Sequence, residues 1–170
     1  PAVGLNAWTD AFGNTCHTLV LDEPRDRIEI VASGEVVTSD VNGVLPHEDG
    51  ELPLEVFLRH TDQTKLDAGL RDFAQSFSDG LAKNRLDTLH DLMGQIRDRV
   101  DYHTGKTDAL ATAIEAFSSG KGVCQDHAHI FIGCARALGV PARYVSGYLY
   151  DGEHSEAYVA GHAWAAAWVE

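Results

Sequence analysis

Residues 120–129 read Gly-Lys-Gly-Val-Cys-Gln-Asp-His-Ala-His and predict a glycine-rich turn that leads into a helix. The helix runs from about Cys124 to Leu138, where Gly139 followed by Pro141 provides a common helix end. Cys124 falls in the first turn, where unpaired N–H groups and a partial positive charge favour the thiolate form of a cysteine. The same N–H groups can stabilise a developing oxyanion, so the segment predicts a nucleophilic cysteine.

Three helices are predicted before this segment, because apolar residues recur there at steps of three and four. The first follows a cap at Thr61 or Asp62, and the third stops at Ser118-Ser119-Gly120. The second ends near Tyr102. The three predicted ranges are 66–77, 86–102 and 108–117.

Two strands are predicted after the cysteine helix, over Arg143–Tyr150 and His162–Val169. In the first, a face that includes Val145 and Leu149 alternates with one that includes the tyrosines. In the second, His162 and Trp164 share one face while alanines occupy the other. Helices that precede strands, without alternation of the two, indicate an α+β fold.

The N-terminal part has a different pattern. Turns such as Asp10–Asn14 separate short stretches with the character of strands, and a segment rich in glycine and proline follows over 42–54. We therefore predict part of a β-rich region over residues 1–54 and a separate core over residues 55–170. The strands expected in the first region are Thr15–Leu21, Arg27–Ala32 and Gly34–Val41.

Composition excludes several classes of protein. The chain has 170 residues with 26 acidic and 13 basic side chains, a formal charge of −13 that argues against nucleic acid or an anionic membrane as partner. No apolar run is long enough to span a membrane, and no secretory signal opens the sequence. Three cysteines offer no disulfide framework and suit a reducing compartment, so we expect a cytoplasmic protein.

A thiolate nucleophile needs a base, and nine histidines compete for that role. His127 lies one helical turn after Cys124 and is expected to stack beside its backbone, while His129 points elsewhere. His162 opens the tryptophan-rich strand, where a sheet can lie against the cysteine helix. The pattern alone leaves His162 equally open to a role as a surface histidine at a strand end.

Three segments together resemble the core of the bacterial transglutaminase-like superfamily: Gly122–Asp126, Ala137–Tyr148 and Gly161–Trp164. The resemblance implies a papain-like α+β core with a Cys-His-Asp triad, in which Cys124 is the nucleophile and His162 the base. The turn at Asp10–Asn14, with the histidine and the Glu-Pro turn that follow, resembles the β-rich region that precedes this core in one bacterial branch.

The sequence departs from the family at the third member of the triad. The resemblance places the aspartate on the strand after the histidine strand, and the chain stops at Glu170 before that strand. Asp101, Asp126 and Asp151 are carboxylates within the chain, but none occupies the matching position. We therefore expect a core that is cut before the aspartate strand, and a fragment with impaired or no activity.

The chemistry expected is acyl transfer through a thioester on Cys124, acting on a protein or peptide amide and needing no metal or cofactor. Cys124 N–H is one natural oxyanion donor, and Gln125 N–H or the Trp164 indole is a candidate for the second. The resemblance places Tyr102 near the cleft, although a capping aromatic is the alternative. A cysteine protease or amidase is the first choice, and a protein-cross-linking transglutaminase is the second.

Two other classes stay open. Cys124, His127 and His129 could form a metal site, although a structural zinc normally has four ligands and no second pair is evident. A domain that keeps the fold and uses its cleft only for binding is the other alternative. Cys16 and Cys134 are interpreted as small packing residues.

Overall fold

The computed structural model describes residues 5–24, 26–31, 33–45, 52–103, 110–149 and 160–169. Contacts divide the chain into two compact units, Pro1–Pro53 and Leu54–Glu170.

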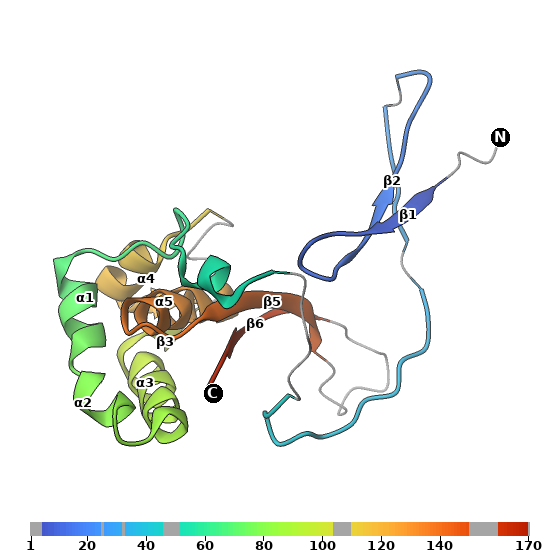
Figure 1. The fold of residues 1–170 in the computed structure, drawn as a ribbon. Coiled ribbons are helices and arrows are strands. Elements are labelled where there is room, and N and C mark those ends of the chain that lie inside the picture. The colour runs from blue at the N-terminus through green and yellow to red at the C-terminus, as the bar shows by residue number, and fades with distance from the viewer. Residues whose placement is uncertain are drawn as a thin grey trace, which may run out of the picture. The chain divides into compact units, whose positions relative to one another are not determined.

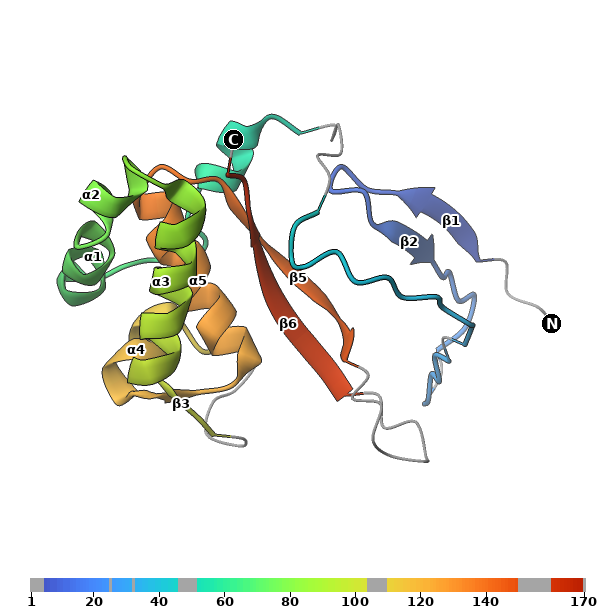
Figure 2. The same cartoon turned by 90° about the horizontal axis from the view of Figure 1, so that it is seen from below.

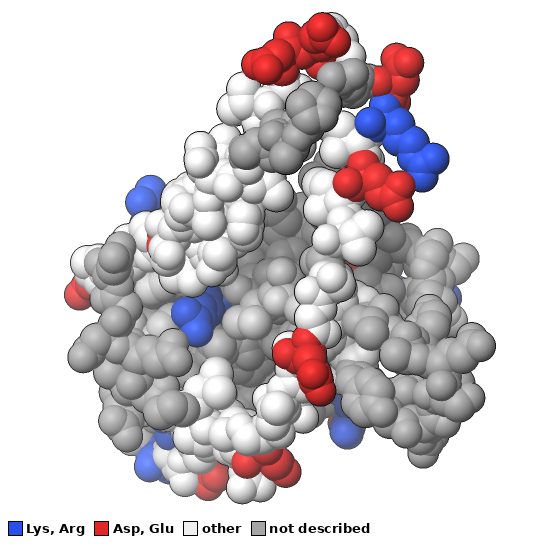
Figure 3. Space-filling model, turned by 90° about the vertical axis from the view of Figure 1, so that its right-hand side faces the viewer, with Lys and Arg blue, Asp and Glu red and all other residues white. Residues whose placement is uncertain are grey.

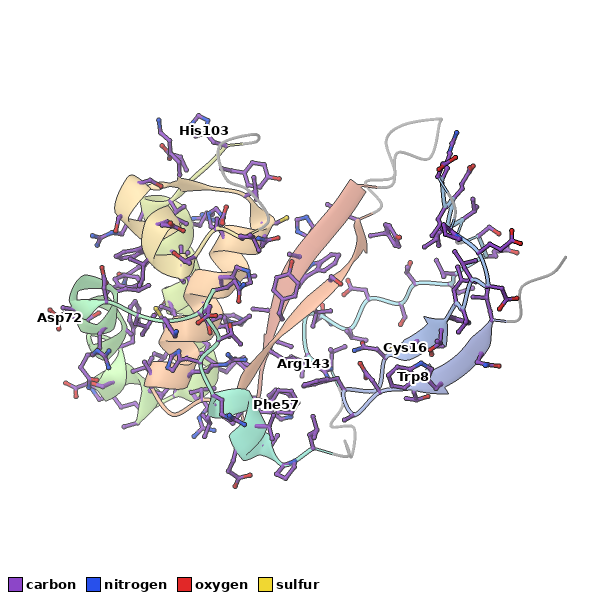
Figure 4. All side chains as sticks on the ribbon, turned by 90° about the horizontal axis from the view of Figure 1, so that it is seen from above. Trp8, Cys16, Phe57, Asp72, His103 and Arg143 are labelled. Carbon is purple, nitrogen blue, oxygen red and sulfur yellow. The ribbon has the colours of Figure 1, made fainter. Side chains whose placement is uncertain are left out.

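The first unit is built on an antiparallel pair of strands, β1 (Asn6–Thr9) and β2 (Thr15–Thr18). Trp8 and Cys16 lie opposite each other in this pair (Figure 4). The predicted turn between the strands is present: Asp10 Oδ1 accepts the N–H groups of Phe12 and Asn14 at 2.9 and 2.8 Å. The hydrogen bond from the Asn14 side chain, together with these two backbone bonds, holds the pKa of the Asp10 carboxyl below its usual value.

The other strands expected in this unit are not formed. β2 ends at Thr18, and the described residues of 26–31 and 33–45 contain no strand. The apolar side chains that suggested a strand face are left outside any packed layer, since Ile30 is 87% and Val37 98% exposed. Alternation of residues predicts a strand only where a neighbouring strand supplies hydrogen bonds and a covered face.

The second unit places one helix between other helices and a sheet. Helix α5 (Cys124–Ala137) lies against α1, α3 and α4 on one side and against the antiparallel strands β5 and β6 on the other (Figures 1 and 2). The unit is therefore α+β with helices packed on an antiparallel sheet, as predicted. Its other elements are η1 (Leu54–Leu58), α1 (Ala68–Gln75), α2 (Ser78–Leu81), α3 (Arg85–Arg99), β3 (Asp101–Tyr102), α4 (Ala113–Ser119), β4 (Lys121–Gly122), β5 (Ala142–Leu149) and β6 (Ala160–Ala167).

The core of this unit gathers around α5. Leu70, Leu92 and Ile96 from the outer helices meet Ile130 and Ile132 of α5, and all are essentially buried. Each such side chain contributes about 1.5–3 kcal/mol relative to an exposed position. At one end of the sheet, Phe57 and Arg143 both pack on the Trp168 ring, with ring centroids 4.6 Å apart for the Phe57 pair (Figure 4).

Several helix ends differ from the prediction. The cap of α1 is Asp67, whose Oδ1 accepts Leu70 N–H at 2.8 Å, and the predicted cap at Thr61 or Asp62 is wrong. Thr61 N–H instead donates to the Thr64 hydroxyl within a turn. Helix α3 stops at Arg99, so that Tyr102 belongs to strand β3 and not to the helix.

The third helix also begins later than predicted. Thr112 caps α4, and its hydroxyl and N–H exchange hydrogen bonds with Glu115. The first two residues of the predicted range, 108–109, lie outside the described residues. The helix ends at Gly120, whose φ of +65° is the left-handed conformation that glycine adopts easily.

The two long strands pair with Gly147 opposite His162 and Tyr144 opposite Ala165. Ala163 is buried, and the alanines at 165 and 167 pack against the core cluster that includes α5. Small side chains on this face allow the helix to approach the sheet closely. His162 and Trp164 alternate with these alanines along β6.

Candidate active site

The loop that carries the cysteine is held by a short parallel strand pair. Lys121 and Gly122 of β4 lie opposite Asp101 and Tyr102 of β3. Asp101 N–H donates to the Gly120 carbonyl at 2.9 Å, and the N–H of residue 103 donates to the Gly122 carbonyl at 2.8 Å. The glycine turn predicted from the sequence is therefore fixed to the end of α3 and is not a free loop.

Cys124 is the first residue of α5 and follows Val123, the N-cap. The cysteine is half-buried and forms no disulfide. This position at the N-terminus of a helix is the one predicted, and it places the sulfur at the positive end of the helix dipole.

Asp126 anchors the loop from inside. Its side chain is completely buried, and Oδ2 accepts Val123 N–H at 2.7 Å. A Cβ on Gly122 would lie 2.7 Å from Asp126 Cβ and 2.9 Å from Oδ2, so only glycine leaves room for the carboxylate. Asp126 thus helps to shape the turn that precedes Cys124.

His127 has both ring nitrogens next to backbone carbonyls. Nδ1 lies 2.9 Å from the Val123 oxygen, and Nε2 lies 2.8 Å from the Val100 oxygen. The Tyr102 ring stacks on the imidazole with centroids 6.4 Å apart, while the Tyr102 side chain is 61% exposed. Because both nitrogens are engaged, His127 has no nitrogen left for a proton of the substrate or for a metal ion.

His129 and Tyr144 form a second aromatic pair, between α5 and β5, with ring centroids 5.2 Å apart. His129 Nδ1 is buried and has no hydrogen-bond partner among the described residues. Burial lowers the pKa of His129; the charge of Asp126 opposes this effect and that of Arg136 adds to it. Burial raises the pKa of Tyr144, and the negative charges of Cys124 and Asp126 raise it further.

Tyr144 lies near the candidate site through its contact with His129, and it was not among the residues predicted from the sequence. It occupies the strand that crosses α5 and shares the electrostatic surroundings of Cys124. The available signal was the alternation in 143–150, which places it on one face of that strand with Ser146 and Tyr148.

His162 is half-buried near the start of β6. Its ring meets the Trp164 ring edge to face, with centroids 4.6 Å apart, and a Cβ on Gly147 would lie 3.3 Å from the Trp164 ring. β6 packs against α5, but within the described residues no hydrogen bond joins His162 to Cys124. The structure therefore brings the two side chains onto packed elements without linking them.

The other predicted residues have these positions. Gln125 is the second residue of α5 and half-buried, and Trp164 is 39% exposed. Asp101 lies exposed on β3, and Asp151 is outside the described residues. In the ranges that the structure describes, no group of three or more His, Cys, Asp or Glu side chains could hold a metal ion.

The two remaining cysteines differ from Cys124. Cys134 is buried in the middle of α5, and burial raises the pKa of its thiol to about 12. Cys16 is half-buried and belongs to the other unit.

Surface properties agree with the composition. On the face shown in Figure 3, acidic side chains stand among uncharged ones, and the few Lys and Arg side chains drawn there are scattered. None of the helices in the described residues is long and apolar enough to cross a membrane.

Comparisons with known proteins agree with the resemblance seen in the sequence. The model of the transglutaminase-like superfamily matches residues 71–170. The crystal structure of a "Putative Cysteine Protease from Cytophaga hutchinsonii" superimposes with a TM-score of 0.55 and 25% identity, covering 67% of this chain and 37% of that protein.

Curated relatives come from mycobacteria. An uncharacterized protein of Mycobacterium leprae is 40% identical over 79 residues, which are 42% of this chain and 27% of the relative. An uncharacterized protein of Mycobacterium tuberculosis is 36% identical over 88 residues, which are 49% of this chain and 28% of the relative. The matches thus span less than a third of these relatives. With the family match over more than half of its length, the chain belongs to the transglutaminase-like superfamily.

Proposed function

We propose that the chain is a thiol-dependent acyl-transfer enzyme, a cysteine protease or amidase, with Cys124 as nucleophile and His162 as base. The observation that carries the proposal is the placement of Cys124 at the N-terminus of α5, behind a turn that Asp126 and β3 hold in place. Family membership and the name of the Cytophaga hutchinsonii protein support the same class of chemistry.

In the proposed reaction the Cys124 thiolate attacks the carbonyl carbon of a protein or peptide amide. The carbonyl oxygen takes the negative charge, and Cys124 N–H donates to it, with Gln125 N–H or the Trp164 indole as second donor. The C–N bond then breaks, and His162 gives its proton to the leaving amine. Water then attacks the thioester and gives its proton to His162, the C–S bond breaks, and the acid is released with the thiolate and the protonated His162 restored.

The third group of the triad is part of the proposal. An aspartate that orients His162 belongs on the strand after β6. Asp101 lies exposed on β3, and Asp126 is buried and holds the loop before Cys124. We expect a chain extended past Glu170 to cleave amides about a hundredfold faster or more, because an orienting carboxylate is worth that much in such triads. Equal rates for the two chains would show that no such aspartate contributes.

The experiment measures amine release from casein and from a carboxamide peptide, for the extended chain and three variants. Cys124→Ala and His162→Gln should each lose at least about 99% of the rate. The matched control His90→Gln changes an exposed histidine on α3 and should retain the full rate of amine release. Full activity of Cys124→Ala would refute the proposal.

Addition of a primary amine separates the two enzymatic alternatives. A hydrolase releases free acid whether or not the amine is present, whereas a transglutaminase incorporates the amine into the substrate. A pure binding module would retain a peptide equally well before and after the change Cys124→Ala, and it would release no product in either form.

A further inference from the structure

Val123, the residue directly before the nucleophile, is held at both its N–H and its carbonyl oxygen. Val123 N–H donates to Asp126 Oδ2 at 2.7 Å, and the Val123 carbonyl oxygen lies 2.9 Å from His127 Nδ1. This oxygen belongs to the same planar peptide as the Cys124 N–H, on its opposite edge. The backbone N–H groups of Asp126 and His127 also donate to this oxygen, at 3.0 and 3.1 Å, so the His127 ring adds a third contact to the carbonyl. Groups that fix the Val123 carbonyl also fix the direction of the Cys124 N–H.

The other nitrogen of the same ring determines its protonation state. His127 Nε2 lies 2.8 Å from the Val100 carbonyl oxygen, at the end of α3. A carbonyl oxygen only accepts, and a neutral imidazole has a single N–H, so a neutral ring would leave a bare nitrogen facing an oxygen at hydrogen-bond distance. Both contacts are satisfied only when both nitrogens carry hydrogen.

The groups around the ring are compatible with a positive charge. Tyr102 on β3 stacks on the imidazole, with an angle of 23° between the planes. On α5 itself the neighbouring residue is Asp126, a buried acid, and Cys124 lies one turn away. The positive end of the helix dipole acts against a cation here, while the two carbonyl oxygens and the acid act for it.

We propose that His127 is a positioning residue, held as an imidazolium between the Val100 and Val123 carbonyls, which helps the backbone bonds of the first helical turn to orient the Cys124 N–H and supplies a positive charge beside the Cys124 thiolate. This inference deepens the proposed function and rests on it. Residues three apart on a helix have Cβ atoms about 5–6 Å apart, close enough for the charge to act on the sulfur.

The direct test is spectroscopic. In the unaltered protein at neutral pH, nitrogen-15 NMR of the histidine rings should give His127 two similar nitrogen resonances, both coupled to a proton, as in an imidazolium. One protonated and one bare nitrogen would overturn the proposal. This measurement needs no variant and no turnover.

The second test measures the charge at Cys124. Iodoacetamide should alkylate Cys124 about three- to tenfold more slowly in His127→Gln than in the unaltered chain at pH 7, the size expected for one charge near a half-buried thiolate. At a pH where every accessible thiol is ionised, the two rates should converge. His90→Gln, which changes an exposed histidine, should match the unaltered chain at both pH values.

The outcomes separate the two claims. Equal alkylation of His127→Gln and the unaltered chain at pH 7 would overturn the charge role, as would a slower rate that persists at high pH, since that indicates a change of access. Absence of amide cleavage would overturn the proposed function, yet it would leave the NMR and alkylation results of this inference standing.

Discussion

The first turn of α5 and its middle contain the same residue type in opposite surroundings. Cys124, at the first turn, is half-buried beside Asp126, His127 and the carbonyl of Val123. Cys134, in the middle, is fully buried, and burial raises its thiol pKa to about 12. Position along one helix therefore separates a cysteine suited to chemistry from one suited to packing.

The comparison also explains why the reactive cysteine and the packing cysteine can be told apart from their neighbours in the sequence. Polar residues and glycines surround Cys124, whereas Ile130, Ile132 and Ala135 surround Cys134 in an apolar run. Reactivity follows from the N-terminal position and the glycines, and inertness follows from the hydrophobic neighbours.

The largest expected effect is on reaction with an activated ester. Cys124→Ala should slow the burst of p-nitrophenol from p-nitrophenyl acetate by about a thousandfold or more, because the nucleophile is lost. Cys134→Ala should retain the burst rate within about twofold and instead lower the free energy of unfolding by about 1 kcal/mol through a small cavity. Loss of the burst in Cys134→Ala, with the fold intact by circular dichroism, would contradict the assignment of Cys134 as a packing residue with no part in the reaction.

Alkylation compares the two thiols within one molecule. At pH 8 the native protein should react with iodoacetamide at Cys124 at least about a hundredfold faster than at Cys134, since a buried thiol of pKa about 12 is almost entirely protonated. Peptide mapping by mass spectrometry measures both rates. In denaturant the rates should become similar, and equal rates in the native protein would show that burial does not protect Cys134.

Two glycines test the packing at the same two places. Gly122→Ala should lower the free energy of unfolding by about 1–3 kcal/mol, because the new methyl lies 2.7 Å from Asp126 Cβ. Gly133→Ala should have a similar cost, since its methyl lies 2.8 Å from the Thr64 carbonyl oxygen and from Leu66 Cδ2.

The matched control is Gly94→Ala on α3, where no atom lies within 4 Å of the added methyl. It should stabilise the helix by about 0.5–1 kcal/mol. Denaturant unfolding measures all three variants. Of the two destabilising variants, only Gly122→Ala should also slow alkylation of Cys124. An equal effect of Gly133→Ala on that rate would contradict the claim that the first turn of α5 controls reactivity and its middle only packing.

The smallest expected effect concerns His129 and pH. Burial lowers its folded-state pKa below 6.5, so the unfolded chain binds the proton more readily. The stability of the folded protein is therefore unaffected by protonation of His129 above pH 6.5, where the ring is neutral in both states. It falls as the pH drops below 6.5, because protonation then favours the unfolded chain. Between pH 7.5 and 5.5 the loss should be below about 1 kcal/mol, because the side chain is partly exposed.

His129→Phe, which keeps a ring on Tyr144 and does not titrate, should flatten this dependence in chemical unfolding measured across the same range. His90→Gln should leave the slope unchanged, since that residue is exposed. A slope that persists in His129→Phe would assign the effect to another group.

Local signals in the sequence were enough to predict α5 and the sheet. Gly120, Gly139 and Pro141 mark helix ends by backbone geometry, and the observed helix, Cys124–Ala137, agrees with the predicted range to within a residue. The strand ranges also agree closely, because alternation in a paired, half-covered strand is a strong signal.

Features that depend on distant contacts were not predictable. The Val100 carbonyl meets His127 only because the end of α3 lies beside α5, and Tyr144 meets His129 only because β5 crosses that helix. The strands expected at Arg27–Ala32 and Gly34–Val41 failed for the same reason, since pairing depends on a neighbour that a single segment does not encode.

The most direct test of the central claim is to trap the acyl-enzyme. The protein is mixed with p-nitrophenyl acetate, quenched in acid within the burst, digested and analysed by mass spectrometry. We expect an acetyl thioester on the peptide that contains Cys124, its absence from Cys124→Ala, and slower loss of the adduct in His162→Gln. A burst without an adduct on Cys124, or with the acetyl group on Cys16 or Cys134, would contradict the assignment of the nucleophile.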